Sequence, residues 1–270
     1  MNKDEMTLGD LCKFYEFQET KSLFFEEIPV YARLDGIGFS KFTKQSGFTK
    51  PYDKRMSDAM IATMNHLVDV FDATCGYTQS DEISLAWSGK PLIFNGKKQK
   101  MISTLASRAS VHFYRFLEAA KEIDSTNEAA LWSEPGFDCR VFQLPTKELC
   151  AKQFLWRELD ATKNAVSMAA QQYFSHKQLH EKNSKEKQEM LFSKGVNFNE
   201  YPEFFKRGTF SIRKKVFKEL DQEILNKIPE SQRPKGPVER NILVVGSLPP
   251  LLSIKNREEV LFEGKEPILY

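Results

Sequence analysis

The sequence predicts an α+β fold with a β-α-β-β-α-β core followed by a helical extension. Four short apolar runs are typical of strands and lie at residues 28–34, 74–79, 82–87 and 137–144. Apolar residues recur at helical spacing between the first and second runs and between the third and fourth. This order is that of the split-βαβ, or ferredoxin-like, arrangement. We expect the core at residues 1–145, with a helical extension and tail packed on it at residues 146–270.

The first expected strand, residues 28–34, ends in an acid that is followed by two spaced glycines. Asp35 would therefore stand at the mouth of the strand, beside backbone that Gly36 and Gly38 leave open. A carboxylate in this place suits Mg²⁺, which takes oxygen ligands from few carboxylates together with substrate phosphate. Gly36 can offer its backbone carbonyl as a further ligand.

The next expected element is a helix that Pro51 opens, because proline is tolerated in the first helical turn. Its core face has apolar side chains at a spacing of about 3.6 residues, at Met56, Met60, Thr63, Met64, Leu67 and Phe71. Two short strands follow, and the tight acidic turn Gln79-Ser80-Asp81-Glu82 joins them. The alternation of Ile83, Leu85 and Trp87 with small residues supports the second of these strands.

In the split-βαβ topology the first strand and this hairpin are neighbours. Asp35 would then converge with Asp81 or Glu82 on one metal cluster, where two Mg²⁺ ions would serve phosphoryl transfer. The alternative is that Asp, Ser and Gly stand at these positions only because turns favour them. The presence of acids on two adjacent strand ends favours the metal site.

Three lysines open the second expected helix at about 97–121, and they are Lys97, Lys98 and Lys100. Free N–H groups and the positive end of the helix dipole favour phosphate at a helix start. Such lysines are commonly only solvated surface, but beside a metal cluster we expect Lys97 and Lys100 to clamp a triphosphate. The fourth strand follows this helix, and Pro145 ends it.

The extension contains the best candidate for nucleic-acid contact, residues 204–218. Aromatic side chains interleave there with basic ones and no acid is present, the basic residues from 206 onward being Lys206, Arg207, Arg213, Lys214, Lys215 and Lys218. Lysine and arginine neutralise backbone phosphate, and aromatic rings stack on bases. An amphipathic helix with a solvated basic face is an equal alternative. The tail at 229–270 contains six prolines, and we expect irregular packing there.

Composition sets limits but selects no activity. The chain has 270 residues, 41% hydrophobic and 28% charged, and a formal net charge of +2, which is too small to indicate nucleic acid by itself. Its four cysteines lie far apart, which argues against a disulfide framework or zinc ribbon. No apolar run approaches the roughly 18 residues of a membrane span. We expect a cytoplasmic protein with no membrane partner, and a cleaved organellar transit peptide stays open.

Several short motifs occur in the order known from one family. They are Ala32-Arg33-Leu34-Asp35-Gly36, Lys50-Pro51-x-Asp53-x-Arg55, Gln79-Ser80-Asp81-Glu82, Phe137-Asp138-x-Arg140-Val141, Trp156-Arg157, Leu191-Phe192-Ser193 and Arg207-Gly208-Thr209. On these motifs the chain resembles the histidine-tRNA guanylyltransferase family, which adds nucleotides in the 3′-to-5′ direction. The resemblance covers roughly residues 28–212 and implies a polymerase-type palm, in agreement with the element order above.

The resemblance also implies roles for individual residues. Asp35, Gly36 and Asp81 would hold two Mg²⁺ ions, and Glu82 would support the same catalytic cluster. The residues expected to contact ATP, GTP or another NTP are Arg33, Lys50, Asp53, Ser80, Lys97 and Lys100. Those expected to contact tRNA are Asn164, Lys206, Arg207, Arg213, Lys214 and Lys215. The family is typically tetrameric, so a homotetramer is expected on the resemblance alone.

One departure from the family bears on the substrate. Members that guanylylate histidine tRNA have a His-Ile-Asn-Asn run where this chain has Thr162-Lys163-Asn164-Ala165. The chain is therefore most similar to the guanylyltransferase-like proteins, which repair 5′-truncated tRNA against a template. Non-templated addition of G₋₁ to histidine tRNA stays an alternative, as do a palm-fold nucleotidyl cyclase and a non-catalytic RNA-binding module.

Overall fold

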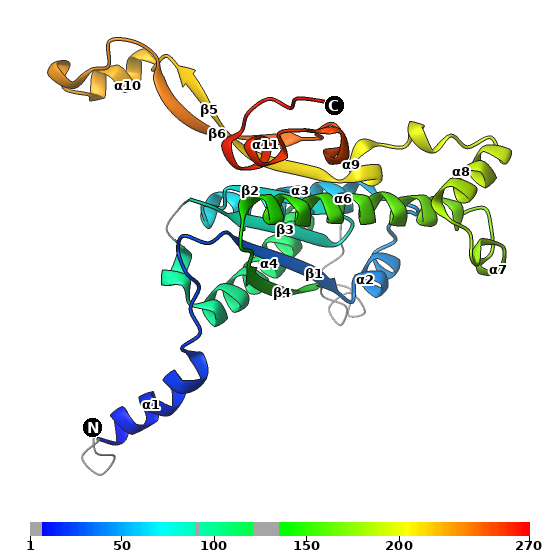
Figure 1. The fold of residues 1–270 in the computed structure, drawn as a ribbon, viewed down its shortest axis with the longest axis horizontal. Helices are drawn as coiled ribbons and strands as arrows, with labels where there is room; N and C mark the ends of the chain where they lie inside the picture. The colour runs from blue at the N-terminus through cyan, green and yellow to red at the C-terminus, as the bar shows by residue number, and fades with distance from the viewer. Residues whose placement is uncertain (1–6, 90–91, 121–134) are drawn as a thin grey trace.

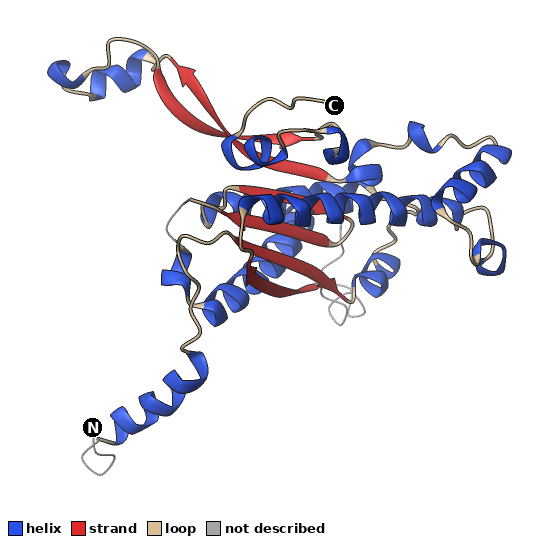
Figure 2. Cartoon of the chain, in the orientation of Figure 1, coloured by secondary structure: helices blue, strands red, loops and turns tan. Residues whose placement is uncertain are grey.

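The computed structural model describes residues 7–89, 92–120 and 135–270 of the chain. Figure 1 and Figure 2 show a central sheet with helices on both faces and two elongated projections. The elements are α1 (Leu8–Thr20), β1 (Val30–Ile37), α2 (Phe39–Gln45), α3 (Lys54–Val70), β2 (Cys75–Gln79), β3 (Glu82–Trp87), α4 (Lys98–Ala119), β4 (Gly136–Gln143), α6 (Lys147–Ala170), α7 (His176–Leu179), α8 (Ser184–Ser193), α9 (Glu203–Arg207), β5 (Thr209–Lys218), α10 (Gln222–Lys227), β6 (Val238–Gly246) and α11 (Arg257–Glu263).

The strands form one antiparallel sheet in the order β4-β1-β3-β2-β5-β6. Its first four strands and the helices between them follow the expected β-α-β-β-α-β order. The predicted adjacency of the first strand and the hairpin is confirmed, because β1 pairs with β3 from Val30 to Asp35. Asp35 lies opposite Glu82 in this register and opposite Asp138 of β4 on the other side. The end of β1 thus brings acids from three strands into one row.

Each face of the sheet has its own apolar core, because side chains alternate between faces along a strand. Ala32 and Leu34 of β1 belong to the cluster that α3 and α4 cover. Tyr31 belongs to the opposite cluster, which includes Phe154 of α6 and Leu261 of α11. The two layers of helices fix the sheet from both sides and therefore hold the end of β1 in place.

Helix boundaries follow from capping and packing. Asp53 caps the N-terminus of α3 by accepting a hydrogen bond from the Arg55 N–H at 2.9 Å, so α3 begins at Lys54 and not at Pro51. Most of the expected apolar face of α3 is buried, including Met60, Met64 and Leu67. Residues 147–170 form the single long helix α6 across one face of the sheet (Figure 1).

The extension contains the expected helices and, in addition, two strands that the sequence did not predict. Residues 209–218 form β5, which pairs with the edge strand β2 and with β6, so the alternative of an amphipathic helix at 204–218 is wrong. Only Glu203–Arg207 is helical in that stretch. The free edge of β2 supplies the hydrogen-bond partners that convert this segment into a strand. The tail, expected to be irregular, contributes β6 and α11.

Two projections leave the body of the molecule in Figure 1, helix α1 and the outer part of the β5–β6 hairpin with α10. Their aromatic side chains are exposed, Phe17 at 61% and Phe217 at 73% of their maximum area. Among the described residues no helix is long and apolar enough to cross a membrane.

Candidate active site

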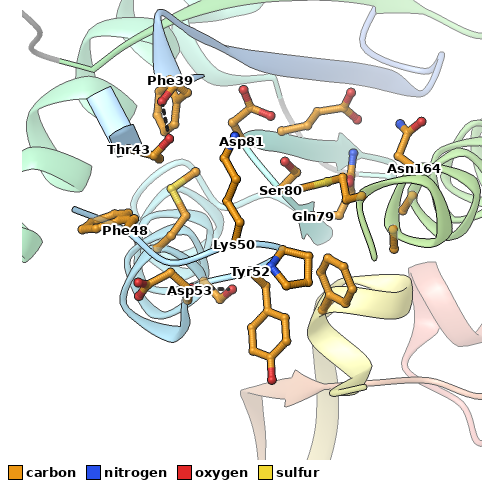
Figure 3. A pocket seen from close by; sticks show the side chains of 18 of the residues that line it. Phe39, Thr43, Phe48, Lys50, Tyr52, Asp53, Gln79, Ser80, Asp81 and Asn164 are labelled. Atoms are coloured by element: carbon orange, nitrogen blue, oxygen red, sulfur yellow. Dashed lines mark hydrogen bonds between the residues drawn. The ribbon is translucent and has the colours of Figure 1, made fainter. Parts of the chain in front are cut away.

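A cavity of about 530 Å³ lies where β1 ends and the β2–β3 turn begins. Its walls come from α2, the loop before α3, the β2–β3 turn, α6 and α9 (Figure 3). This volume is within the range of about 300–1,000 Å³ that is typical of small-molecule sites. Asp35, Asp81 and Glu82 all line it, so the predicted convergence of these acids is found in the structure.

Gly36 allows the end of β1 to approach the acidic turn directly. A Cβ atom added to Gly36 would lie 2.8 Å from the Cβ of Asp81 and 2.5 Å from a ring carbon of Phe39. No larger residue fits between them without displacement of one neighbour. The neighbouring Ser80 has a φ of 49°, which is uncommon for a residue with a side chain. The turn is therefore held in a tight conformation against the strand end.

The surroundings of Asp81 and Glu82 disfavour the charged form of each carboxyl group. Burial raises the pKa of Asp81, and the negative charge of Asp35 raises it further, whereas hydrogen bonds within the turn and from Ser80 lower it. Burial also raises the pKa of Glu82, while Arg157 lowers it. Glu82 is buried and Asp81 is half-buried, and the negative charge of Asp35 raises the pKa of each. A bound cation would offset both the burial and this repulsion.

Arg157 is a site residue for which the sequence predicted no role. Its Nε donates to Glu82 Oε1 at 2.7 Å, and its Nη2 donates to Asp160 Oδ2 at 3.1 Å. Both members of the Arg157–Glu82 pair are less than 10% exposed. The Trp156-Arg157 motif was the available signal, but only the crossing of α6 over the sheet shows which acid the arginine pairs with. One oxygen of Glu82 is therefore already engaged by the protein.

The donor atoms at the end of β1 suit a hard cation. Carboxylates of Asp35 and Asp81, with the carbonyl of Gly36, are oxygen ligands of the kind that Mg²⁺ prefers. Asp138, opposite Asp35, has a buried Oδ1 that no group of the described chain hydrogen-bonds. In the described ranges no three His, Cys, Asp or Glu side chains form a metal cluster by themselves. The set fits a metal that takes its remaining ligands from backbone, water and substrate phosphate.

The predicted nucleotide-binding residues divide into two groups. Lys50, Asp53 and Ser80 line the cavity, and Figure 3 shows the Lys50 side chain extending toward Asp81. Asp53 also has a structural role, because Arg55 and Thr49 donate hydrogen bonds to its carboxylate and hold its pKa well below its usual range. Arg33 lies two residues before Asp35, with its guanidinium 5.7 Å from the centre of the Trp156 ring, outside the cavity lining.

Lys97 and Lys100 are not brought to the cavity. Lys97 forms a β-bridge with Leu23, in the segment before β1, whereas Asp35 lies near the other end of that strand. The reason is that α4 begins after β3 has run back along β1, so that its N-terminus lies at the opposite end of the sheet. The helix expected at about residue 97 does form and begins at Lys98, but its start does not place the lysines beside the acids.

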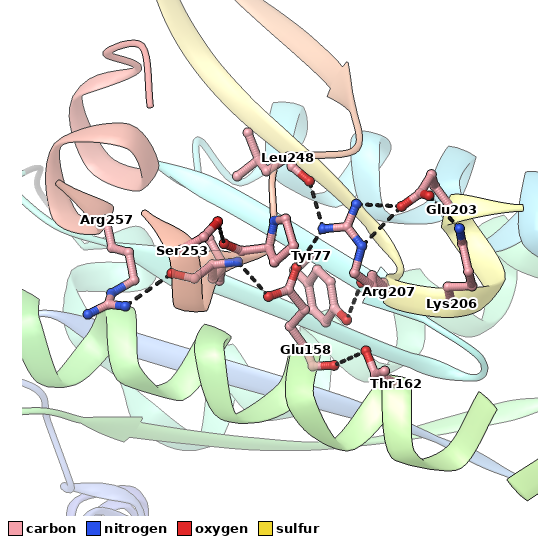
Figure 4. A network of polar contacts seen from close by, with 11 residues as sticks. Tyr77, Glu158, Thr162, Glu203, Lys206, Arg207, Leu248, Ser253 and Arg257 are labelled. Carbon is pink, nitrogen blue, oxygen red and sulfur yellow. Dashed lines mark hydrogen bonds and ion pairs between the residues drawn. The ribbon is translucent and has the colours of Figure 1, made fainter. Parts of the chain in front are cut away.

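Arg207 and Lys206, two of the predicted tRNA-binding residues, pair with acids around α9. Arg207 donates to the carbonyl of Leu248 at 2.9 Å and to Glu203, and lies 3.6 Å from Glu158 (Figure 4). Lys206 pairs with Glu203 at 2.7 Å. These groups hold α9 to the rest of the chain, so their local positions are explained by the fold.

The other predicted tRNA contacts differ in exposure. Arg213 donates to the carbonyls of Ala73 and Val68 at 2.9 and 2.8 Å, and Lys214 pairs with Glu266 at 2.6 Å. The Lys215 side chain is 64% exposed and pairs with Glu239. Asn164 is the one member of the predicted tRNA-binding set, all of whose residues are described, that lines the cavity.

Comparison with known proteins identifies the family of the chain. A model of the family "tRNAHis guanylyltransferase" matches residues 10–145, and a model described as "Thg1 C terminal domain" matches residues 153–245. The tRNA(His) guanylyltransferase of Schizosaccharomyces pombe is 31% identical over 209 residues, which cover 73% of this chain and 78% of the relative. The enzyme of Saccharomyces cerevisiae is 28% identical over 221 residues, covering 73% and 87%.

Solved structures of similar proteins point to the same family. A bacterial tRNA(His) guanylyltransferase (Thg1)-like protein in complex with ATP has a TM-score of 0.67 and 33% identity, covering 77% of this chain and 87% of that one. The complex of such a protein with GTP has a TM-score of 0.69 and 29% identity, covering 94% and 96%. From the family models and these relatives, the chain belongs to the tRNA(His) guanylyltransferase family.

Proposed function

We propose that this chain is a Mg²⁺-dependent nucleotidyltransferase with a polymerase-type palm, which adds nucleotides to the 5′ end of tRNA in the 3′-to-5′ direction. The observation that supports this most directly is the convergence of Asp35, Gly36 and Asp81 at one end of the cavity. The relatives supply the substrate class, since they are tRNA(His) guanylyltransferases, and similar proteins are known in complex with ATP and GTP.

The proposed chemistry joins a 5′ end to the 3′-hydroxyl of an incoming NTP. A 5′-monophosphate first attacks the α-phosphorus of ATP, which releases pyrophosphate and leaves an adenylylated 5′ end, and attack by the 3′-hydroxyl of the NTP then releases AMP. Where the RNA has a 5′-triphosphate, the same attack releases pyrophosphate. Two Mg²⁺ ions held by Asp35, Asp81 and the Gly36 carbonyl would stabilise the developing charge and lower the pKa of the attacking hydroxyl. Lys50 and Ser80, both at the cavity, would bind phosphate oxygens.

The remaining residues of the site would maintain this arrangement. Arg157 holds Glu82 at 2.7 Å and so fixes the base of the β2–β3 turn, from which Asp81 projects. The phosphates of the substrate would complete the ligand shell that two carboxylates leave open. Their charge would also balance the excess of positive charge that two metal ions introduce.

We propose templated repair of 5′-truncated tRNA as the physiological reaction. Thr162-Lys163-Asn164-Ala165, where G₋₁-adding members have His-Ile-Asn-Asn, lies on α6, and Asn164 and Ala165 line the cavity. A change at that wall would alter how the RNA end is held. The proposal includes a homotetramer in which the extension, through Asn164 and exposed groups such as Lys215, contacts tRNA.

The experiment uses purified protein with Mg²⁺, ATP, the four NTPs and a labelled tRNA that lacks its first nucleotide. Growth by one template-matched nucleotide is expected, and Asp35→Asn and Asp81→Asn should each abolish it. Asp58→Asn is the matched control, because this acid pairs with Lys54 on the surface of α3 and does not line the cavity.

Other outcomes separate the alternatives. Addition of G to intact histidine tRNA without regard to the template would establish G₋₁ addition in place of repair. Metal-dependent cyclisation of an NTP would indicate a nucleotidyl cyclase, and RNA binding without any transfer would indicate a binding module. Activity that survives both aspartate substitutions would contradict the proposed site.

A further inference from the structure

The cavity has two apolar walls, and the loop that contains Lys50 lies between them. Phe39, Thr43 and Phe48 form the first wall, on one side of Lys50 in Figure 3. The second wall consists of Tyr52, Phe204 and Phe205, beside the face of α6 that includes Asn164. We call these three aromatic residues the aromatic platform.

The aromatic platform is assembled from segments that are far apart in the sequence. Tyr52 precedes α3, whereas Phe204 and Phe205 belong to α9. The Tyr52 ring lies 5.1 Å from that of Phe205 at an interplanar angle of 35°, and 5.6 Å from that of Phe204 at 79°. Each of the three is half-buried, whereas the nearby Phe198 is buried. Aromatic surface therefore remains available to the cavity.

Groups that suit RNA border this wall. Asn164 of α6 and Gln171, which directly follows α6, line the cavity, and side-chain amides both donate to and accept from base edges. Lys187 donates to Ser167 Oγ at 3.0 Å, and Ser167 also lines the cavity, so a cation stands at the α6 edge. An aromatic surface with adjacent amides and a nearby cation is the composition by which proteins hold unpaired nucleotides.

We propose that the aromatic platform stacks on the base of the 5′-terminal nucleotide of the RNA, while the first wall receives the base of the incoming NTP. The inference rests on the proposed function, because a reaction that joins two nucleotides requires two bases near Asp35 and Asp81. The platform lies on the extension side of the cavity, beside α6 and α9. It therefore belongs to the part of the site that the RNA strand would reach.

The test places the fluorescent base 2-aminopurine at the 5′ terminus of a truncated tRNA transcript. Stacking on the platform should quench its emission when wild-type protein binds. Phe204→Leu should remove most of this quenching and weaken RNA binding about tenfold, the loss expected for one base–aromatic stack. The KM for the incoming NTP should change less than twofold, and Phe204→Trp should restore the quenching.

Two further variants distinguish the loss of stacking from misfolding. Tyr52→Leu alters the platform from the other segment and should give the same loss, with thermal unfolding recorded for each variant. Phe25→Leu is the matched control, because this ring is 72% exposed in the segment before β1, away from the cavity. It should retain wild-type quenching and affinity.

The outcomes distinguish failure of the inference from failure of the proposed function. Wild-type extension of the RNA, with unchanged quenching in both Phe204→Leu and Tyr52→Leu, would overturn the platform and leave the activity standing. The same measurement can be made with 2-aminopurine in the incoming nucleoside triphosphate instead of the RNA. If the two substitutions reduce quenching only for that nucleoside triphosphate, the platform binds the NTP, and the inference is overturned. Wild-type protein that neither binds nor extends the RNA would refute the proposed function, and the platform with it.

Discussion

Glu158 of α6 is a buried carboxyl group whose titration should make the stability of the protein depend on pH. Its Oε2 accepts a hydrogen bond from the Leu251 N–H at 2.7 Å, and its Oε1 lies 3.6 Å from Arg207 (Figure 4). Burial raises its pKa from 4.5 to about 7, although the Leu251 N–H and Arg207 lower it and Glu203 raises it slightly. Between about pH 4.5 and 7, the folded protein therefore keeps a proton on Glu158 that the unfolded chain releases.

The sign and size of the effect follow from linkage. Between pH 4.5 and 7 the folded state binds more protons at Glu158 than the unfolded state, so the free energy of unfolding falls as the pH rises. The difference between the pKa values of about 7 and 4.5, at about 1.4 kcal/mol per pH unit, gives about 3 kcal/mol. About 2.5 kcal/mol of this loss should occur between pH 5 and pH 8.

Urea unfolding at pH 5 and pH 8, at one protein concentration, measures this contribution when wild-type protein is compared with Glu158→Gln. The wild-type protein should lose about 2.5 kcal/mol more than the variant over that interval, because glutamine does not titrate. Glu16→Gln, which changes an exposed acid on α1, should retain the wild-type pH dependence. Equal slopes for wild-type protein and Glu158→Gln would refute the reasoning.

Two further substitutions test the candidate site. Gly36→Ala would place a methyl group 2.5 Å from a Phe39 ring carbon and 2.8 Å from the Cβ of Asp81, so nucleotide transfer should fall at least about tenfold while tRNA binding persists; transfer at the wild-type rate would contradict the tight packing around Gly36. Arg157→Ala should lower the free energy of unfolding in urea by about 3–5 kcal/mol, because it leaves Glu82 buried without its partner. The double variant Arg157→Ala, Glu82→Gln should recover most of that loss.

The sequence was sufficient for the parts of the fold that local patterns determine. The run that ends at Asp35, the acidic turn at Asp81 and the apolar face of α3 each have a periodicity or turn composition that indicates one kind of element. The split-βαβ order then implied that β1 and β3 are adjacent, and the register of Asp35 with Glu82 agrees with that. Local patterns and one topological rule therefore suffice to bring the acids of the site together.

Long-range contacts determined the parts that the sequence did not predict. The segment around Arg213 becomes a strand because the edge of β2 is available to it, and no local pattern shows that edge. The lysines of the 206–215 stretch were correctly identified as basic, but each of the three pairs with an acid, namely Glu203, Glu266 or Glu239. Composition alone does not distinguish a cation that is free to bind RNA from one that already has a partner.

The extension is a structural part of the candidate active site and does more than supply RNA contacts. Asp35 and Asp81 come from the β-α-β-β-α-β core, but the pairing of Arg157 with Glu82 fixes the turn from the face of the sheet that α6 covers. Phe204 of α9 completes the cavity beside the core loop that contains Tyr52. Since α9 also reaches α6 through Arg207 and Glu158, a displacement of the C-terminal segment would alter the wall proposed to hold the RNA end. The geometry of catalysis and the grip on RNA are therefore properties of one connected structure.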